Sequence, residues 1–313
     1  MLSVGGTVLV TGGAGFIGSH IVDRLLKDGV KVRVVDDLST GDKSNLSQHK
    51  NNPDFEFVQG DIRDFGVVQK AVKGVDAVVH EAALVSVIQS VGDPLFSNSI
   101  NVVGSLNLLK ASAEAKVHRF VFASSCAVYG VCEDLPLIEE SSVKPLSPYA
   151  VDKLAVENYA RVFNEVSDLE TVGLRYFNVY GPRQKCGPYC GVISVFLDSF
   201  LRNKSPVIFG DGEQTRDFVN VSDVVEANLC ALTRVQAAGQ VFNVCTGKAT
   251  TVNKVLAAVG EIAGKSEIEA VYKQSRAGDI KHSYGDNSKA KRGLGFEAKV
   301  DLKTGLSELF SVG

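Results

Sequence analysis

The chain has 313 residues, of which 45% are hydrophobic and 22% are charged, so it is long and apolar enough to bury a full core. Its formal net charge of −3 offers no basic surface for nucleic acid or an anionic membrane, and no apolar run approaches the roughly 18 residues of a membrane-spanning helix. The six cysteines form no Cys-x-x-Cys pair and the five histidines are scattered, which argues against a metal site. The lack of a basic leader predicts a cytoplasmic protein.

Residues 7–20 predict a β-strand, a tight turn and the start of a helix. Four β-favouring residues precede a glycine cluster, and an apolar helical pattern follows it directly. Gly12, Gly15 and Gly18 lie three residues apart, where missing side chains let the backbone turn sharply and approach a pyrophosphate. The N–H groups of the first helical turn, at Phe16 and Ile17, then hold the phosphate charge. The alternative is an ordinary strand–helix turn, because chance also produces such glycine spacings.

A second strand over residues 31–35 ends at Asp36 and Asp37, about twenty residues after the glycines. A carboxylate at this position can accept both hydroxyls of the adenosine ribose and would repel a 2′-phosphate, which favours NAD over NADP. The segment continues through Ser39 and Gly41 and is rich in turn-forming residues, so a turn-capping role for the carboxylates is the alternative.

Strands alternate with helices throughout the first half of the chain, which predicts an α/β protein with a doubly wound parallel sheet. Further strands are expected over residues 55–58, 75–80 and 119–123, and a long helix over 95–113. Ligands of such sheets bind outside the carboxyl ends of the strands. The residues that follow these strands, or lie on the long helix, are Asp61, Ile62, Ala82, Ala83, Asn101 and Ser124.

Three side chains predict redox chemistry at this edge of the sheet. Ser125 follows the fifth strand, and Tyr149 and Lys153 lie four residues apart on a helix that begins near Pro148. A phenol is a poor base at pH 7, and an adjacent ammonium, helped by oxidised nicotinamide, favours the phenolate. Ser125 would hold a substrate oxygen while Tyr149 takes its proton and hydride passes to the cofactor. The alternative is a surface Tyr–Lys pair on an amphipathic helix.

The chain resembles the extended short-chain dehydrogenase/reductase family, and more narrowly its nucleotide-sugar epimerases. The resemblance rests on the glycine motif, on the Ser125, Tyr149 and Lys153 set, and on motifs at 175–183, 215–218 and 276–279. It covers essentially the whole chain. It implies a Rossmann-type NAD-binding domain over 1–177, to which some later segments return, and a smaller, interleaved UDP-sugar-binding domain over 178–313.

The resemblance also implies ligand roles position by position. For NAD these residues are Gly12, Gly15, Phe16, Ile17, Gly18, Asp36, Asp37, Ser39, Gly41, Asp61, Ile62, Ala82, Ala83, Asn101, Ser124, Tyr149, Lys153 and Phe177. For the UDP-sugar they are Ser86, Ser125, Cys126, Asn178, Gly191, Val192, Arg216, Arg276, Asp279 and Ser283. The residue types agree with these roles, because two guanidiniums suit a diphosphate and a carboxylate suits ribose hydroxyls.

Departures from related patterns favour one reaction. Sugar 4,6-dehydratases resemble this chain but carry an acidic pair where it has Cys126 and Ala127, and UDP-glucuronate decarboxylases carry Glu at the second position. The reaction that remains is 4-epimerisation, by oxidation at C4, rotation of the ketone and return of hydride. Gly191 and Ser283 stand where enzymes restricted to UDP-glucose and UDP-galactose often carry bulkier residues, which leaves volume for an N-acetyl group. We expect UDP-N-acetylglucosamine and UDP-N-acetylgalactosamine as substrates and, because Val85 is bulkier than the glycine of some N-acetyl-specific relatives, also the unacetylated pair.

Other interpretations stay open. A UDP-glucuronate 4-epimerase or a nucleotide-sugar reductase is one, with Lys281 or His282 as an additional cation, and a catalytically silent NAD-sensing interaction protein is another. The remaining segments predict helices over 192–201, 251–263 and 301–310 and a strand over 241–244. Helices over 95–113 and 149–164 have apolar positions to spare, and relatives pair them in a four-helix bundle, which implies a homodimer.

Overall fold

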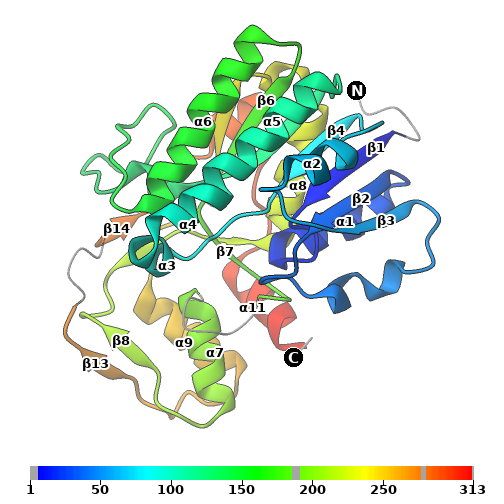
Figure 1. Ribbon diagram of the computed structural model, residues 1–313. Helices are drawn as coiled ribbons and strands as arrows, with labels where there is room; N and C mark the ends of the chain where they lie inside the picture. Colours follow the sequence, from blue (N-terminus) through cyan, green and yellow to red (C-terminus); the bar gives the residue numbers. More distant parts are fainter. Residues whose placement is uncertain (1–5, 185–190, 276–279, 312–313) are drawn as a thin grey trace.

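The computed structural model describes residues 6–184, 191–275 and 280–311, and seven parallel strands form its central sheet (Figure 1). Across the sheet the order is β11 (Gln240–Val244), β6 (Glu170–Tyr176), β5 (Arg119–Ser125), β4 (Ala77–His80), β1 (Thr7–Thr11), β2 (Lys31–Asp36) and β3 (Phe55–Gln59). The chain reverses its direction of travel across the sheet between β3 and β4, so a switch point lies between β1 and β4. Ligands of such sheets bind at the carboxyl ends of these strands.

Helices cover both faces of the sheet. One face packs against α1 (Phe16–Lys27), α8 (Val221–Thr233) and α10 (Ser288–Gly293), and the other against α2 (Phe65–Ala71), α5 (Ser105–Glu114) and α6 (Pro148–Val166). Alternate strand residues enter the two cores, as Val78 and Val79 of β4 do. The predicted α/β, doubly wound parallel sheet is therefore confirmed. No helix within the described ranges is long and apolar enough to cross a membrane.

The helix expected over 95–113 is present, but part of it is not α-helical. The segment contains α4 (Pro94–Asn98), a π-helical stretch η2 (Ser99–Gly104) and then α5, and the short α3 (Val87–Gly92) precedes them. The Ser105 hydroxyl donates to the Asn101 carbonyl at 2.5 Å, and such local side-chain bonds compete with the regular helical ladder. The Asn101 side chain in turn binds the backbone of Leu84, at 2.8 and 3.1 Å. The irregular turn thus joins this helical segment to the loop that follows β4.

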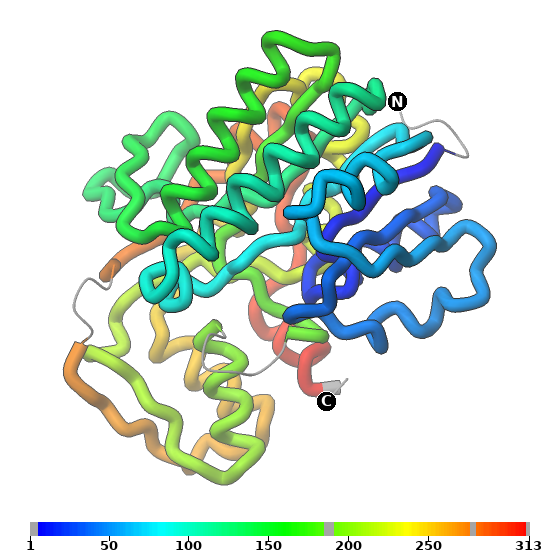
Figure 2. Tube along the Cα trace, in the orientation of Figure 1, coloured from blue at the N-terminus to red at the C-terminus, as the bar shows by residue number. Residues whose placement is uncertain are grey.

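A smaller lobe has its own apolar core. It consists of α7 (Val192–Leu201), α9 (Val252–Ile262), α11 (Leu302–Ser311) and the paired strands β8 (Val207–Phe209) and β13 (Val271–Lys273). Figure 2 shows its yellow-green and orange segments together below the sheet, although they are far apart in sequence. Between them, β11 and α8 return to the main sheet, so the two lobes are interleaved as expected. The division into 1–177 and 178–313 stays a prediction.

Short strands lie at the boundary of the two lobes. β7 (Asn178–Tyr180) continues from β6 and pairs with β10 (Phe218–Asn220), while β9 (Thr215–Arg216) lies between β12 (Thr250–Thr251) and β14 (His282–Ser283). Three 3₁₀ turns complete the described elements: η1 (Lys43–His49), η3 (Cys126–Tyr129) and η4 (Val235–Ala237). Because β14 and β9 are parallel neighbours, the expected substrate residues Ser283 and Arg216 become register partners.

Candidate active site

The glycine loop between β1 and α1 is shaped as its sequence predicts. Gly12 has φ +67°, and a Cβ there would lie 2.7 Å from the Ala82 nitrogen, so the turn packs directly on the segment after β4. A Cβ on Gly18 would overlap the Gly12 carbonyl oxygen. Gly15 is the N-cap of α1 and provides no capping side chain, so the first-turn N–H groups, including those of Phe16 and Ile17, have no side-chain acceptor at this cap. This arrangement fits the pyrophosphate of a dinucleotide.

The two carboxylates after β2 have different partners. Asp36 is buried, and its Oδ2 accepts the N–H of Ala14 in the glycine loop at 2.9 Å. A Cβ on Gly41 would lie 2.8 Å from Asp36 Oδ1, so only glycine leaves this carboxylate its space. Asp37 accepts the N–H and the hydroxyl of Ser39, at 2.9 and 2.7 Å. Asp36 is therefore the one placed against the glycine loop, and Asp37 caps a turn.

Asp61 and Ile62 follow β3 on the same edge. Asp61 accepts hydrogen bonds from the Arg63 guanidinium through both carboxylate oxygens. Its Oδ2 accepts from Nε at 2.9 Å and from Nη2 at 2.5 Å, and its Oδ1 accepts from Nε at 3.0 Å. The side-chain hydrogen bonds from Arg63 hold the pKa of Asp61 below its usual range, so it stays an ionised acceptor. Ile62 is buried beneath it.

The segment after β4 is tied down from two directions. The Ala82 N–H reaches Thr11 Oγ1 at 3.4 Å, and Asn101 holds both backbone groups of Leu84. The Asn101 side chain is therefore engaged with this loop, and its expected contact with the cofactor would come in addition. His80, at the end of β4, lies between Thr11 and Ser105, and burial lowers its pKa to about 3, so it is neutral.

Ser125, Tyr149 and Lys153 come together at the carboxyl end of β5. Ser125 is the last residue of β5, and its hydroxyl shares a hydrogen bond with the Tyr149 phenol. The Lys153 Nζ lies 5.9 Å from the Tyr149 ring centroid and donates to the Ala123 carbonyl at 2.7 Å. Ser147 caps α6 by accepting the Ala150 N–H at 3.2 Å, which fixes the first turn where Tyr149 lies.

Burial controls the protonation states of Tyr149 and Lys153. Burial raises the pKa of Tyr149 to about 12, and the hydrogen bond with Ser125 is the main opposing influence. Burial also lowers the pKa of Lys153 to about 8. Desolvation of the phenol therefore outweighs any effect of the nearby ammonium, and Tyr149 is a neutral phenol. A phenolate at pH 7 requires an additional positive charge, which oxidised nicotinamide carries.

Asp217 organises the substrate side, and the sequence analysis gave it no role. It is fully buried, and its Oδ1 accepts the N–H and hydroxyl of Thr246 at 2.8 and 2.7 Å, while its Oδ2 accepts the Gly247 N–H at 2.9 Å. Its carbonyl accepts the Asn178 side chain at 3.1 Å. Asp217 therefore fixes the backbone that carries its neighbour Arg216. The sequence signal that could have indicated a structural role for Asp217 is an acidic residue between an arginine and a phenylalanine, Arg216 and Phe218.

The remaining expected substrate residues are spread around this edge. Cys126 is half-buried next to Ser125, and Ser283 is buried. Ser86 caps α3 by accepting the Gln89 N–H at 3.1 Å. The others are Gly191 and Val192, the N-cap and first residue of α7. Phe177, which was expected to contact NAD, is buried. Arg276 and Asp279 lie outside the described residues.

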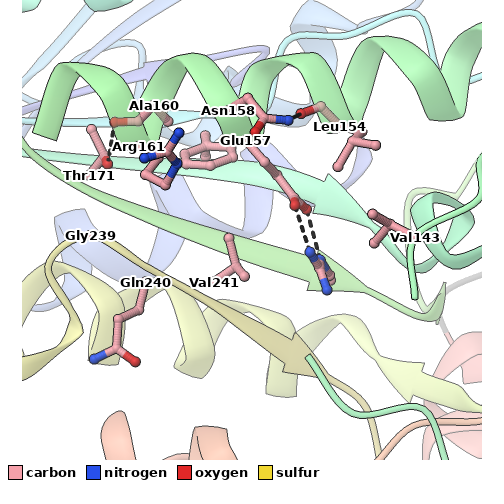
Figure 3. Close-up of a pocket in the computed structure, with 12 residues that line it drawn as sticks. Val143, Leu154, Glu157, Asn158, Ala160, Arg161, Thr171, Gly239, Gln240 and Val241 are labelled. Carbon is pink, nitrogen blue, oxygen red and sulfur yellow. Dashed lines mark hydrogen bonds and ion pairs between the residues drawn. The ribbon is translucent and has the colours of Figure 1, made fainter. Parts of the chain in front are cut away.

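A buried ion pair supports the site from below and was also missed. Glu157 on α6 accepts two bonds from Arg175, at 2.9 Å from Nε and 2.7 Å from Nη2, and it accepts the hydroxyl of Ser124, the neighbour of Ser125. Arg175 also donates to the Tyr129 hydroxyl at 2.9 Å. Both residues line a cavity of about 290 Å³ between α6 and the strands β6 and β11. Figure 3 shows Glu157 among the lining residues of this cavity.

The geometry can now be compared with known proteins. The model of the NAD dependent epimerase/dehydratase family matches residues 8–245. The chain belongs to this family. A UDP-glucose 4-epimerase from Mycolicibacterium smegmatis is 40% identical over 302 residues, covering 96% of each chain. A UDP-N-acetylglucosamine 4-epimerase from Methanobrevibacter ruminantium, solved with UDP-N-acetylmuramic acid, superimposes with a TM-score of 0.94 at 39% identity over 99% of this chain and 98% of that one.

The family membership settles several expectations about this epimerase/dehydratase. A Thermus thermophilus UDP-glucose 4-epimerase, solved in complex with NAD, has a TM-score of 0.89 and 38% identity, covering 98% of each chain. NAD as the cofactor, the resemblance to nucleotide-sugar epimerases and the isomerase class of the enzyme are thereby confirmed. The loop around Gly12, Gly15 and Gly18 and the buried Asp36 are the residues of this chain that fit the cofactor.

Proposed function

We propose that this protein catalyses the NAD-dependent 4-epimerisation of a UDP-hexose. The observation that carries the proposal is the meeting of Ser125, Tyr149 and Lys153 at the end of β5, on the sheet edge that the glycine loop also borders. Relatives that share the fold and over a third of the sequence are named as UDP-sugar 4-epimerases. A catalytically silent NAD-sensing protein has less support, because such a protein has no need for these three side chains in contact.

The side chains divide the work of proton transfer. Ser125 holds the C4 oxygen of the sugar through its hydroxyl, and Tyr149 exchanges the proton of that oxygen. Bound NAD supplies the acceptor, and later the donor, of the C4 hydride. Lys153 contributes a buried positive charge beside the phenol and is held by the Ala123 carbonyl. Burial excludes water from the pair, which strengthens every charge interaction during the transfer.

The position next to Ser125 supports epimerisation over dehydration. Dehydration requires a further acid and base, and Cys126 and Ala127 stand where an acidic pair would act. Burial raises the pKa of the Cys126 thiol to about 12, so it supplies neither group near pH 7. Removal and return of hydride at the same carbon needs no such pair.

Two small residues favour the N-acetylated sugars. Ser283 is a register partner of Arg216, the expected diphosphate ligand, and Gly191 is exposed at the start of α7. Both leave volume near the sugar that a bulky side chain would fill. The glucuronate alternative has less support, because Lys281 is exposed and lies 4.0 Å from Asp211, an acidic partner at the surface.

Proton NMR of the purified protein tests the proposal. The protein, with no added cofactor, is incubated separately with UDP-N-acetylglucosamine and with UDP-glucose. Appearance of the C4 epimer supports both the reaction and retained NAD, and the ratio of the two rates tests the argument from Ser283 and Gly191. Failure of both substrates, even with NAD supplied, would contradict the proposal, and UDP-glucuronate would be tried next.

The predicted homodimer and cytoplasmic location are further proposals. Apolar side chains stay exposed on α3, α4 and α6, with exposed fractions of 62% for Val91, 83% for Leu95 and 52% for Val151. Patches of this kind are typical of interfaces between protein chains. Sedimentation at the monomer mass of 33.4 kDa would rule the dimer out.

A further inference from the structure

Glu81 is a carboxylate at the carboxyl end of β4 to which no role has yet been given. It follows His80, which contacts Ser105 of α5 at 2.8 Å, so the alternation of strand residues directs Glu81 toward the opposite face. There its Oε1 accepts the hydroxyl of Tyr176, on β6, at 2.7 Å. Because β5 lies between β4 and β6, this hydrogen bond crosses the end of the strand that carries Ser125.

Asn228 of α8 fixes the direction of this hydrogen bond. Its Nδ2 donates to the Tyr176 oxygen at 2.7 Å and to the Val224 carbonyl at 2.9 Å, and a carbonyl can only accept, so the amide orientation is determined. The Tyr176 oxygen therefore accepts a hydrogen bond from Asn228, and the Tyr176 hydroxyl donates one to Glu81. A donor aimed at a carboxylate favours its ionised form.

Lys153 is the cation that this carboxylate compensates. Its Nζ donates to the Ala123 carbonyl at 2.7 Å, and Ala123 follows Phe122, the register partner of His80, so the ammonium lies on β5 beside the position that Glu81 takes after β4. Three carboxylates raise the pKa of Lys153, and Glu81 has the largest influence, followed by Asp152 and Glu157. Glu157 is paired with Arg175, and Asp152 accepts hydrogen bonds from side chains of α4. Glu81 forms no ion pair within 4.0 Å among residues 6–184, 191–275 and 280–311. The other titratable groups that face Glu81 are Tyr149 and Tyr176, and α8 adds the neutral Asn228.

We propose that Glu81 is a positioning residue that keeps Lys153 in its ammonium form, and that Tyr176 and Asn228 orient its carboxylate for this task. This inference rests on the proposed role of Lys153 beside Tyr149. Burial raises the pKa of Glu81 to about 7 and lowers that of Lys153 to about 8. The charge of each group opposes the pKa shift that burial causes in the other. If one group loses its charge, the charged form of the other therefore becomes less stable.

The titration of Lys153 can be followed directly in the cofactor-free protein. Lysine labelled with ¹³C at Cε gives one NMR signal per side chain, and Lys153→Arg assigns the signal of interest. In the wild-type protein we expect a two-step titration curve, with one step from Lys153 and one from Glu81. Glu81→Gln keeps an acceptor for Tyr176 but removes the charge. It should leave a single step, shifted to lower pH by about one unit.

A matched control separates this effect from a general change in charge. Glu165→Gln removes a carboxylate that is 58% exposed on α6, and it should leave the Lys153 curve unchanged. Tyr176→Phe removes the donor to Glu81, so the Glu81 step should move to higher pH. Identical Lys153 curves in the wild type and Glu81→Gln would overturn the proposal.

The wild-type measurement keeps the proposal testable if Glu81→Gln does not fold. A single-step Lys153 curve in the wild-type protein would then overturn it. The epimerase assay with UDP-sugars is independent of this readout. Absence of epimerisation with an intact two-step curve would refute the proposed function but leave the coupling of Glu81 to Lys153.

Discussion

Replacement of Arg175 by Met tests the buried network below the site. The Arg175 and Glu157 side chains are 5% and 7% exposed, so both charges are removed from water. Arg175 donates two bonds to Glu157, one to the Tyr129 hydroxyl at 2.9 Å and one to the Glu139 carbonyl at 3.0 Å. The variant Arg175→Met fills a similar volume but removes all four bonds and leaves Glu157 as an uncompensated buried charge.

The expected loss in the free energy of unfolding is about 3–5 kcal/mol, the range for removal of one partner from a buried ion pair. With an unfolding entropy of about 2.1 cal/mol/K per residue, this corresponds to a Tm lowered by about 5–8 °C.

Urea unfolding at pH 7 measures this loss in the free energy of unfolding. Arg161→Met is the control, because Arg161 and Glu165 form an exposed i,i+4 pair on the same helix, and it should cost about 0.5 kcal/mol or less. Arg175→Met combined with Glu157→Gln removes the unpaired charge and should recover about 2 kcal/mol relative to Arg175→Met alone. A loss below about 1 kcal/mol in the single variant, or a strictly additive double variant, would refute this reasoning.

Three further substitutions test the site itself. Tyr149→Phe should keep NAD and the stability of the fold but lower turnover by about 10²–10⁴-fold in the NMR assay, and activity near the wild-type level would contradict its proton-transfer role. Gly18→Ala places a Cβ against the Gly12 carbonyl, so unfolding free energy should fall by about 1–3 kcal/mol and less NAD should remain bound after gel filtration, whereas unchanged retention would show that the loop tolerates the methyl group. Ser283→Tyr should lower the rate with UDP-N-acetylglucosamine relative to UDP-glucose by about tenfold or more, and equal losses with both sugars would contradict the steric argument.

Local patterns predicted much of the fold because they depend on neighbours in sequence. The turn that contains Gly12 and the helix that carries Tyr149 and Lys153 follow from spacings of three and four residues. The parallel, doubly wound sheet follows from the alternation of strands and helices, which leaves few topologies open. The position of Ser125 at a strand end then follows from the same alternation.

Contacts between distant segments could not be predicted in this way. Asp217 binds Thr246 and Gly247, roughly thirty residues away in sequence, and no spacing rule connects them. The π-helical stretch around Asn101 accompanies hydrogen bonds to the Leu84 backbone, and an apolar pattern that predicts one helix does not report this change of helix type. The raised pKa of Tyr149 depends on complete burial, which the residue type alone does not indicate.

The two polar networks have a shared consequence for the site. Ser124 and Ser125 are neighbours at the end of β5. Ser124 reaches Glu157 of α6, while Ser125 lies by Tyr149 of the same helix and has Tyr176 as its register partner. The end of β5 is thus held between a fully charged pair on one face and a hydrogen-bonded carboxylate on the other. Because catalysis depends on the precise placement of reacting groups, we expect these buried groups to affect turnover through the geometry of Ser125 and Tyr149 as well as through stability.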